Sequence, residues 1–226
     1  MGKKISILIV LVLSFTRIWG VGNIYFSGNS NERKIALTFD DGPNDTSLPK
    51  ILNLLKEENV KASFFFIGRN IKARREEVKR TYDEGHLVLN HSYTHSNFEK
   101  VSQDIIAQEI EKTNSEINNI IGVVPSLYRP PYGIKTSSGK LAAKKMGMDI
   151  ILWNVDGEDW SSKKSVKEII ETQKKQTKNG SIILMHTQPD KYTSYEALTV
   201  LIPYYREQNY QFVTLDELLK VNAYKN

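Results

Sequence analysis

The sequence predicts a single α/β domain with a mainly parallel sheet, and three observations support this fold class. The 226 residues are 40% hydrophobic and 25% charged, which suits one globular domain with a sizeable core. From Lys34 onward, short runs of β-branched and aromatic residues alternate with longer segments of helical periodicity. No repeat, linker or low-complexity tract interrupts this alternation, so residues 23–226 are expected to form one domain.

Residues 1–22 precede that domain and have the layout of an export signal. Lys3 and Lys4 are followed by an apolar stretch over residues 5–15. A cleavage site of small residues is poorly formed around Gly20, so the segment is either a signal peptide or an uncleaved membrane anchor. We therefore expect an exported protein, located outside the cell, in the cell wall or on the outer face of the membrane.

Seven strands are predicted along the domain, with helices between them. The strand segments are residues 35–39, 62–67, 86–90, 126–129, 150–155, 181–185 and 211–214. A helix is expected over residues 105–121, where the isoleucines fall along one stripe. Three further helix starts are marked by pairs with capping-box spacing: Ser165 with Glu168, Thr193 with Glu196, and Thr214 with Glu217. This pattern suits either a barrel-like or an open α/β sheet.

The composition excludes several classes of protein. The chain has no cysteine, which removes disulfide frameworks, thiolate metal sites and cysteine nucleophiles. Its formal net charge is +5, but three of the basic residues lie in the N-terminal segment. The domain itself has 28 basic and 26 acidic residues, a balance too even to predict a nucleic-acid partner.

Clusters of unusual residues follow five of the predicted strands at their C-terminal ends. In order they are residues 40–43, His91 with His95, residues 129–133, residues 156–160, and His186. In parallel α/β sheets and barrels, ligands bind at this edge because the loops there converge over the sheet. Turn chemistry can account for one such cluster, but not for five at the same edge.

The histidine pair predicts a metal site. His91 and His95 are four residues apart, a spacing that can turn two imidazoles toward one point. Two imidazoles and one carboxylate leave open positions on a divalent ion, which suits a catalytic metal such as zinc. Asp40 and Asp41 can supply the carboxylate and a general base, because successive residues leaving a strand point different ways.

The remaining clusters supply partners for this chemistry. Arg129 can hold the base ionised through a charge-assisted hydrogen bond. His186 then remains as the proton donor for the leaving group, with Asp156 or Asp159 available to orient its imidazole.

Together the clusters resemble the five ordered motifs of the polysaccharide deacetylases, the NodB-homology group also called carbohydrate esterase family 4. The matching segments are residues 38–43, 91–95, 129–133, 156–160 and 184–186, and the resemblance spans residues 33–220. It implies a distorted (β/α)7 barrel. It also implies three ligands for one divalent metal ion: Asp41, His91 and His95. We expect zinc, with cobalt or nickel as alternatives.

The resemblance further implies five catalytic residues. They are Asp40 as the base, Arg129 as its partner, the backbone amide of Tyr132 as an oxyanion donor, His186 as the acid, and Asp156 as the partner of His186. Leu87 and Leu89 stand where the family usually has a glutamate and a small residue, so packing behind the metal is expected to differ.

The implied reaction is hydrolysis of the N-acetyl groups of N-acetylglucosamine units in a polysaccharide, with release of acetate. Export and the slightly basic domain favour a cell-wall glycan, with peptidoglycan as the first choice and chitin oligosaccharides as the second. A subset of the family that acts on muramic acid in spores carries asparagine in place of the second aspartate and lacks the following proline. Asp41 and Pro43 argue against that subset. We expect a monomer with a glycan as its partner, and membrane contact through residues 1–22 if they are retained.

Three alternative functions stay open at this point. A glycosidase would use a carboxylate pair such as Asp156 and Asp159, but would not need the two histidines at metal-binding spacing. A non-haem iron oxygenase shares the two-histidine, one-carboxylate site, yet needs neither the base nor the acid. A glycan-binding module without activity would be expected to have lost part of the set.

Overall fold

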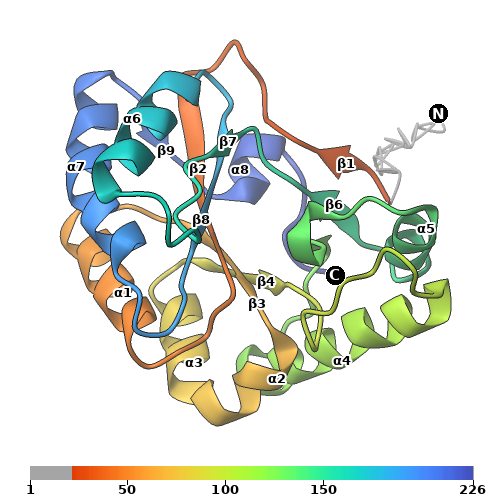
Figure 1. The fold of residues 1–226 in the computed structure, drawn as a ribbon. Coiled ribbons are helices and arrows are strands. Elements are labelled where there is room, and N and C mark those ends of the chain that lie inside the picture. Colours follow the sequence, from red (N-terminus) through yellow and green to blue (C-terminus); the bar gives the residue numbers. More distant parts are fainter. Residues whose placement is uncertain (1–21, 226) are drawn as a thin grey trace, which may run out of the picture.

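The computed structural model describes residues 22–225, which form an α/β domain around a curved parallel sheet (Figure 1). The predicted export segment, apart from Gly22, lies outside the described residues. Within residues 22–225, every helix is too short or too polar to span a bilayer.

The sheet contains nine strands within the described residues, and all pairings between them are parallel. They are β1 (Ile24–Tyr25), β2 (Lys34–Asp40), β3 (Ser63–Phe66), β4 (Leu87–Asn90), β5 (Leu127–Tyr128), β6 (Asp149–Ile151), β7 (Val155–Asp156), β8 (Ile182–His186) and β9 (Gln211–Phe212). Their order is β1-β6-β5-β4-β3-β2-β8-β7, with β9 paired to β2. The α/β class predicted from the sequence is confirmed.

The predicted strand over residues 150–155 is split between the two ends of this order. β6 pairs with β5 and β1, whereas β7 pairs with β8 at the opposite end. Only residues 152–154 link them, so Ile151 and Val155 lie at most about 14 Å apart. The sheet must therefore curl until its ends approach each other, which is consistent with a (β/α) barrel. Asn154 eases the change of partners, because its amide oxygen accepts the backbone N–H of Ile182 at 2.9 Å.

The seven predicted strand segments all contain a strand, but β1 was not predicted. With two residues it is too short to show a periodicity, and its pairing with β6 fixes its conformation. At the other extreme, β2 is buried along nearly its whole length. Such burial on both faces is typical of a central strand in a parallel sheet.

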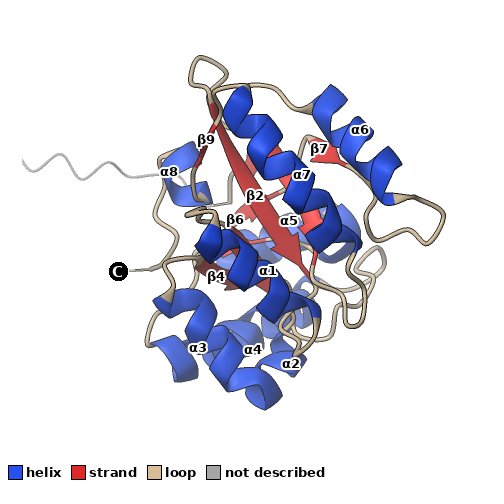
Figure 2. Cartoon of the chain, turned by 90° about the vertical axis from the view of Figure 1, so that its left-hand side faces the viewer, coloured by secondary structure: helices blue, strands red, loops and turns tan. Residues whose placement is uncertain are grey.

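Helices pack against the sheet. They are α1 (Ser47–Glu57), α2 (Gly68–Ile71), α3 (Arg75–Asp83), α4 (Gln103–Ile121), α5 (Ser137–Lys145), α6 (Val166–Gln176), α7 (Thr193–Glu207) and α8 (Leu215–Leu219), with 3-10 turns η1 (Lys72–Arg74) and η2 (Pro131–Gly133). Figure 2 shows α1 and α7 lying across β2. Ile35, Leu37 and Phe39 of β2 share one hydrophobic cluster with residues of these two helices. The short α8 lies in a cluster with Ala36, on the other face of β2.

The capping predictions had mixed outcomes. Ser165 and Glu168 form the predicted capping box at the start of α6. The prediction for Thr193 was wrong, because this residue lies inside α7 and its hydroxyl donates to the backbone oxygen of Asp159. Thr214 precedes α8 as expected but makes no capping hydrogen bond, since its hydroxyl donates to Asp216 instead. At both positions the threonine hydroxyl donates to another acceptor, the Asp159 backbone or the Asp216 side chain, and so does not cap the helix.

Candidate active site

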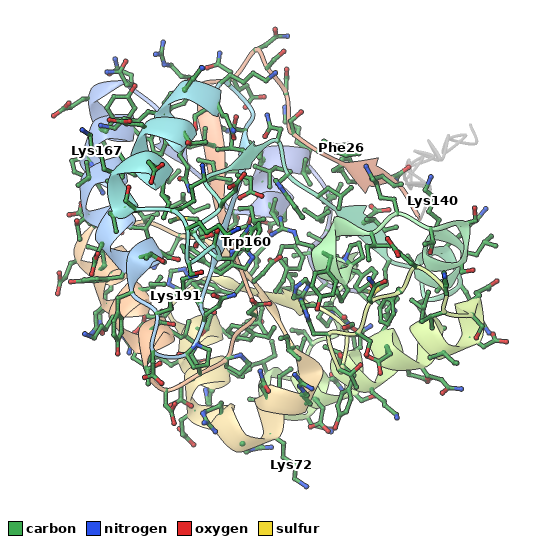
Figure 3. All side chains as sticks on the ribbon, in the orientation of Figure 1. Phe26, Lys72, Lys140, Trp160, Lys167 and Lys191 are labelled. Atoms are coloured by element: carbon green, nitrogen blue, oxygen red, sulfur yellow. The ribbon has the colours of Figure 1, made fainter. Side chains whose placement is uncertain are left out.

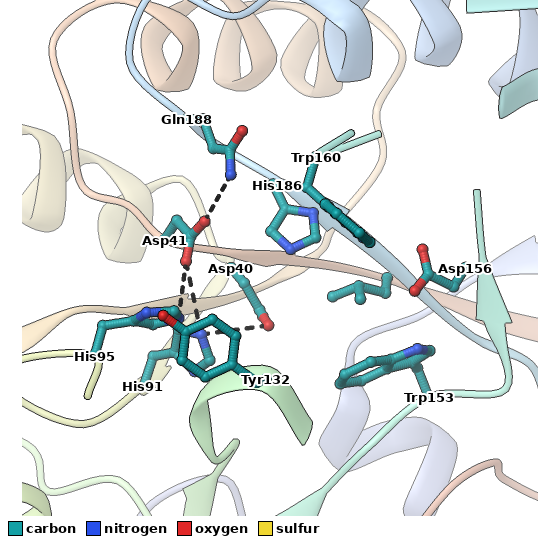
Figure 4. Close-up of a pocket in the computed structure, with 11 residues that line it drawn as sticks. Asp40, Asp41, His91, His95, Tyr132, Trp153, Asp156, Trp160, His186 and Gln188 are labelled. Atoms are coloured by element: carbon teal, nitrogen blue, oxygen red, sulfur yellow. Dashed lines mark hydrogen bonds and ion pairs between the residues drawn. The ribbon is translucent and has the colours of Figure 1, made fainter. Parts of the chain in front are cut away.

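A cleft of about 500 Å³ opens at the C-terminal ends of the strands (Figure 4). All five predicted motifs contribute residues to its lining, and Arg129 of the third motif is buried rather than part of the lining. The lining residues are Asp40, Asp41, His91, His95, Tyr132, Trp153, Asp156, Trp160, Leu184, His186 and Gln188. The parallel register brings the motifs together, since Asp40 at the end of β2 lies opposite His186 at the end of β8.

Asp41, His91 and His95 form a group that can hold a metal ion, the one such group found within residues 22–225. The three ligand atoms lie within 4.8 Å of one another. Oδ1 of Asp41 is 3.4 Å from Nε2 of His95 and 3.8 Å from Nε2 of His91. Two imidazole nitrogens and one carboxylate oxygen are a donor set that suits a divalent ion such as zinc, with positions left open for a substrate.

Hydrogen bonds prepare two of these residues as ligands. Nδ1 of His91 lies 2.8 Å from the backbone oxygen of Arg129, so this nitrogen carries the proton and Nε2 keeps its lone pair. Oδ2 of Asp41 accepts a hydrogen bond from Gln188 at 3.1 Å, which leaves Oδ1 toward the histidines. Burial works to raise the pKa of Asp41, but the nearby imidazoles and the Gln188 hydrogen bond outweigh it and lower the pKa.

The loop that carries His95 is fixed by a carboxylate on α4. Oε2 of Glu109 accepts the backbone N–H groups of Tyr93 at 3.0 Å and Thr94 at 2.7 Å, and the Thr94 hydroxyl at 2.9 Å. Glu109 was not identified as functional from the sequence. Its position on a predicted amphipathic helix gives no sign that it reaches a loop fifteen residues earlier in the chain.

Asp40 is buried and held by an arginine. Nη1 of Arg129 donates to Oδ1 of Asp40 at 2.7 Å and to the Thr38 hydroxyl at 2.9 Å. Thr38 and Asp40 are two residues apart on β2, so both point to the same side of the sheet. Arg129 is fully buried and lies over the ring of Phe65, with 4.2 Å between its guanidinium carbon and the ring centroid. The ion pair therefore fixes the orientation of the Asp40 carboxylate.

The partner of His186 is Asp159, and the expectation that Asp156 takes this position was wrong. Oδ1 of Asp159 lies 2.8 Å from Nδ1 of His186. Asp156 ends β7 opposite Leu184, two residues before His186, and its carboxylate accepts the backbone N–H of Glu158 at 2.7 Å. The turn through Glu158, whose φ is 58°, brings the chain back so that Asp159 reaches the histidine. Asp156 still lines the cleft.

This pairing controls the charge of His186. Burial lowers the pKa of the imidazole, but the charge and the hydrogen bond of Asp159, together with Asp40 and Asp41, raise the pKa to about 9. His186 is therefore protonated at neutral pH. Because Nδ1 is engaged by Asp159, Nε2 is the ring nitrogen left for the cleft.

Tyr132 lies in η2 with a left-handed backbone, φ 57°. Its ring packs edge-on against His95, with 4.8 Å between ring centroids, and the side chain is 65% exposed. Within residues 22–225 no acceptor takes its backbone N–H, which leaves this group for a ligand. The next residue, Gly133, has φ 64°, and a Cβ there would approach the Trp153 ring to 2.8 Å. Gly133 therefore allows Trp153 to form a wall of the cleft.

Left-handed backbone is concentrated around this cleft. Nine non-glycine residues between positions 22 and 225 have positive φ. Six lie in loops that leave the strands at the site: Asp41, Ser92, His95, Tyr132, Glu158 and Asp190. Residues other than glycine adopt this conformation at a cost, and such strain is often found at functional sites.

Comparison with known proteins gives consistent matches. The profile of the polysaccharide deacetylase family matches residues 27–151. A peptidoglycan-N-acetylglucosamine deacetylase of Bacillus cereus is 38% identical over 199 residues, which cover 87% of this chain and 72% of the relative. The peptidoglycan-N-acetylglucosamine deacetylase of Listeria monocytogenes is also 38% identical, over 82% of this chain, which spans only 39% of that longer protein.

A solved structure matches over nearly the whole described domain. It is a peptidoglycan N-acetylglucosamine deacetylase in complex with 4-naphthalen-1-yl-N-hydroxybenzamide. Its TM-score is 0.86 at 36% sequence identity, and the match covers 91% of this chain and 96% of the solved chain.

Proposed function

The chain belongs to the polysaccharide deacetylase family of hydrolases, and on that premise we propose that it removes N-acetyl groups from the N-acetylglucosamine units of peptidoglycan. One observation carries the proposal. A group that can hold a metal ion, an arginine-held carboxylate and a histidine paired with Asp159 line the same cleft. Hydrolysis of an amide needs these three functions: a site that activates water, a base, and an acid for the departing amine.

The residues present fit the metal that the family uses. Asp41, His91 and His95 would hold one divalent ion, for which we propose zinc, with cobalt or nickel as alternatives. Such an ion would lower the pKa of a water molecule and polarise the acetyl carbonyl. Arg129 and Gln188 orient two of the ligands from outside, as partners of metal ligands commonly do.

Asp40 would accept the proton of the attacking water. Its Oδ1 is taken by Arg129, whereas Oδ2 lies 3.5 Å from Nε2 of His91 and faces the metal group. A base must be correctly aimed before the reaction starts, and the buried ion pair with Arg129 holds the Asp40 carboxylate in place.

Tyr132 and His186 would act on the other two charged centres of the reaction. The unused backbone N–H of Tyr132 would donate to the oxyanion that forms from the acetyl carbonyl. His186 would deliver its Nε2 proton to the nitrogen as the carbon–nitrogen bond breaks, and the products are acetate and a free amine. Asp159 would hold the imidazole in position for this transfer.

The geometry disfavours the glycosidase alternative. Asp159 is 1% exposed and its carboxylate is engaged by His186, so it is not free to form a pair with Asp156 across a glycosidic bond. The oxygenase alternative does not use the base and the acid that the cleft contains. A glycan-binding module without activity is also disfavoured, because no member of the set is missing.

Three further features belong to the proposal. We expect the complete fold to be a distorted (β/α)7 barrel, the protein to act as a monomer, and residues 1–22 to direct it out of the cell as a signal peptide or anchor.

Export is tested by protease added to intact cells or protoplasts, which should degrade the protein. Protection until lysis would contradict export.

The reaction is tested by measuring acetate release from three substrates by the metal-loaded protein. Peptidoglycan should release the most acetate, chitin oligosaccharides less, and acetylxylan little. The His91→Ala variant, purified in the same way, controls for contaminating esterases. If peptidoglycan and chitin oligosaccharides release no acetate above this control, the proposed function is wrong.

A further inference from the structure

A second hollow of about 220 Å³ adjoins the catalytic cleft. The two cavities share Tyr132 and Trp153, so a chain of linked sugars could pass from one to the other along the same wall. The other lining residues are Phe26, Gly133, Lys135 and Leu152. Three aromatic rings thus border a space suited to one pyranose ring, whose apolar faces stack well on aromatic side chains.

Phe26 reaches the hollow because of the short strand β1. β1 runs parallel to β6, with Tyr25 opposite Ile151, and Leu152 donates its backbone N–H to Tyr25 at 2.8 Å. The next residue along the chain, Phe26, therefore lies beside Leu152 at the edge of the sheet where the site is built. Its ring is 45% exposed, and Figure 3 shows it on the surface to one side of Trp160. Phe26 precedes residues 27–151, where the family profile matches.

The charges of the two cavities differ. Carboxylates of Asp40, Asp41 and Asp156 line the catalytic cleft, whereas Lys135 is the charged residue that lines the hollow. Lys135 is exposed, and its Nζ lies 4.9 Å from the centroid of the Phe26 ring. Within the described residues, it forms no ion pair with a carboxylate. An acidic group on a bound sugar would supply the missing partner.

We propose that the hollow formed by Phe26, Lys135 and Trp153 binds an acidic N-acetylated sugar linked to the unit being deacetylated. The anionic group would be a carboxylate on an ether substituent, as on N-acetylmuramic acid. The carboxylate-lined cleft would then hold a neutral sugar, and the hollow beside Lys135 would hold the acidic sugar linked to it. This arrangement matches a glycan in which neutral and acidic sugars alternate. This inference rests on the proposed function, and names the feature by which the site would select peptidoglycan over chitin.

Two tetrasaccharides of equal length test it. One is the alternating N-acetylglucosamine and N-acetylmuramic acid glycan freed of peptide, and the other is chitotetraose, which lacks the carboxylates. For Lys135→Gln, we expect kcat/KM for acetate release from the acidic tetrasaccharide to fall about 3- to 10-fold, mainly through KM. For chitotetraose it should change less than about twofold. The effect on the acidic substrate should shrink at high salt.

Two further variants separate charge from packing. Lys140→Gln removes another exposed lysine, which lies on α5 outside both cavities. This variant should leave kcat/KM unchanged for both tetrasaccharides. Phe26→Ala removes a stacking surface and should lower kcat/KM for both tetrasaccharides. If Lys135→Gln lowers kcat/KM for both substrates equally, or for neither, the hollow does not recognise the carboxylate and the inference is wrong.

Binding measurements keep this inference separate from the proposed function. The dissociation constants of both tetrasaccharides can be measured with the metal-loaded Asp40→Asn variant, with and without Lys135→Gln. If the wild-type protein released acetate from neither substrate, the proposed function would fail. A selective loss of affinity for the acidic tetrasaccharide would still support the hollow as its binding site, and no selective loss would overturn it.

Discussion

The carboxylate of Asp159 holds His186 at two points. Its Oδ1 lies 2.8 Å from Nδ1 of the imidazole, and its Oδ2 accepts the backbone N–H of the same residue, also at 2.8 Å. The hydroxyl of Ser194 donates to Oδ2 as well. Because the carboxylate also accepts the backbone N–H of His186 on β8, it cannot rotate without breaking its hydrogen bonds to His186. One residue therefore sets both the direction and the charge of the proposed proton donor.

This relationship predicts the pH dependence of turnover. A general acid works only when protonated, so activity that depends on His186 should be lost as the pH rises through its pKa of about 9. Asp159→Asn removes the charge that raises this pKa, and the alkaline limb of the kcat/KM profile should move to lower pH. Asp156→Asn is the matched control and should move it far less. An unshifted limb in Asp159→Asn would contradict the assignment.

The role of His186 predicts a difference between substrates. Expulsion of an amine requires its protonation, whereas the phenolate of an activated aryl acetate departs with little help. His186→Ala should therefore reduce N-deacetylation by about 100- to 10,000-fold and reduce ester hydrolysis much less. Both rates are measured on protein of verified metal content. Equal losses on the two substrates would mean that the histidine only supports the structure of the site.

The metal group predicts about one divalent ion per chain and activity that a chelator removes. His91→Ala should abolish both metal binding and activity, as measured by elemental analysis and acetate release. His86 is a suitable comparison, because it is buried outside the cleft and its Nδ1 accepts the backbone N–H of Ala62. His86→Gln should retain the metal even if it lowers the free energy of unfolding. Full activity of metal-free wild-type protein would contradict the site.

The two adjacent aspartates should separate in their effects. Asp40→Asn should keep the metal and lose most turnover, because the base is removed while the Asp41, His91 and His95 group remains. Asp41→Asn should lose metal affinity. The same two preparations, assayed for bound metal and acetate release, decide between the assignments, since the opposite result would exchange the two roles.

Glu109 predicts an effect on metal affinity from outside the cleft. Glu109→Ala removes the acceptor of three hydrogen bonds that fix the loop before His95, and should weaken metal binding about 10-fold or more. Glu109→Gln keeps an acceptor and should have a smaller effect. Glu111→Ala, on the exposed side of the same helix, is the control. Titration with cobalt, followed by its absorption spectrum, reports the affinity without relying on turnover.

The sequence predicted the strands and the edge where the site lies because both depend on local patterns. Apolar runs that end in polar residues place Asp40, His91 and His186 at neighbouring strand ends in any parallel arrangement. The sequence also left Asp156 and Asp159 as alternative partners of His186. The choice depends on the turn through Glu158, whose left-handed backbone has no distinct signal in the residues around it.

Other features could not be predicted because they depend on contacts between distant segments. β1 is defined by its pairing with β6, more than one hundred residues later in the chain. Glu109 and Gln188 become relevant only when the fold brings them to the loops of the metal group. Trp153 faces the cleft because it lies in the link where the chain leaves β6 for β7.

The left-handed residues around the cleft also bear on how this protein can evolve. Each non-glycine residue in that conformation costs roughly 1 kcal/mol, and none of the six belongs to the three hydrophobic clusters of the core. Substitutions there should be able to remove catalysis without unfolding the α/β domain. In a lineage released from selection for turnover, activity should decay before the fold does. A laboratory screen that selects only for thermal stability should likewise enrich well-folded variants that no longer react.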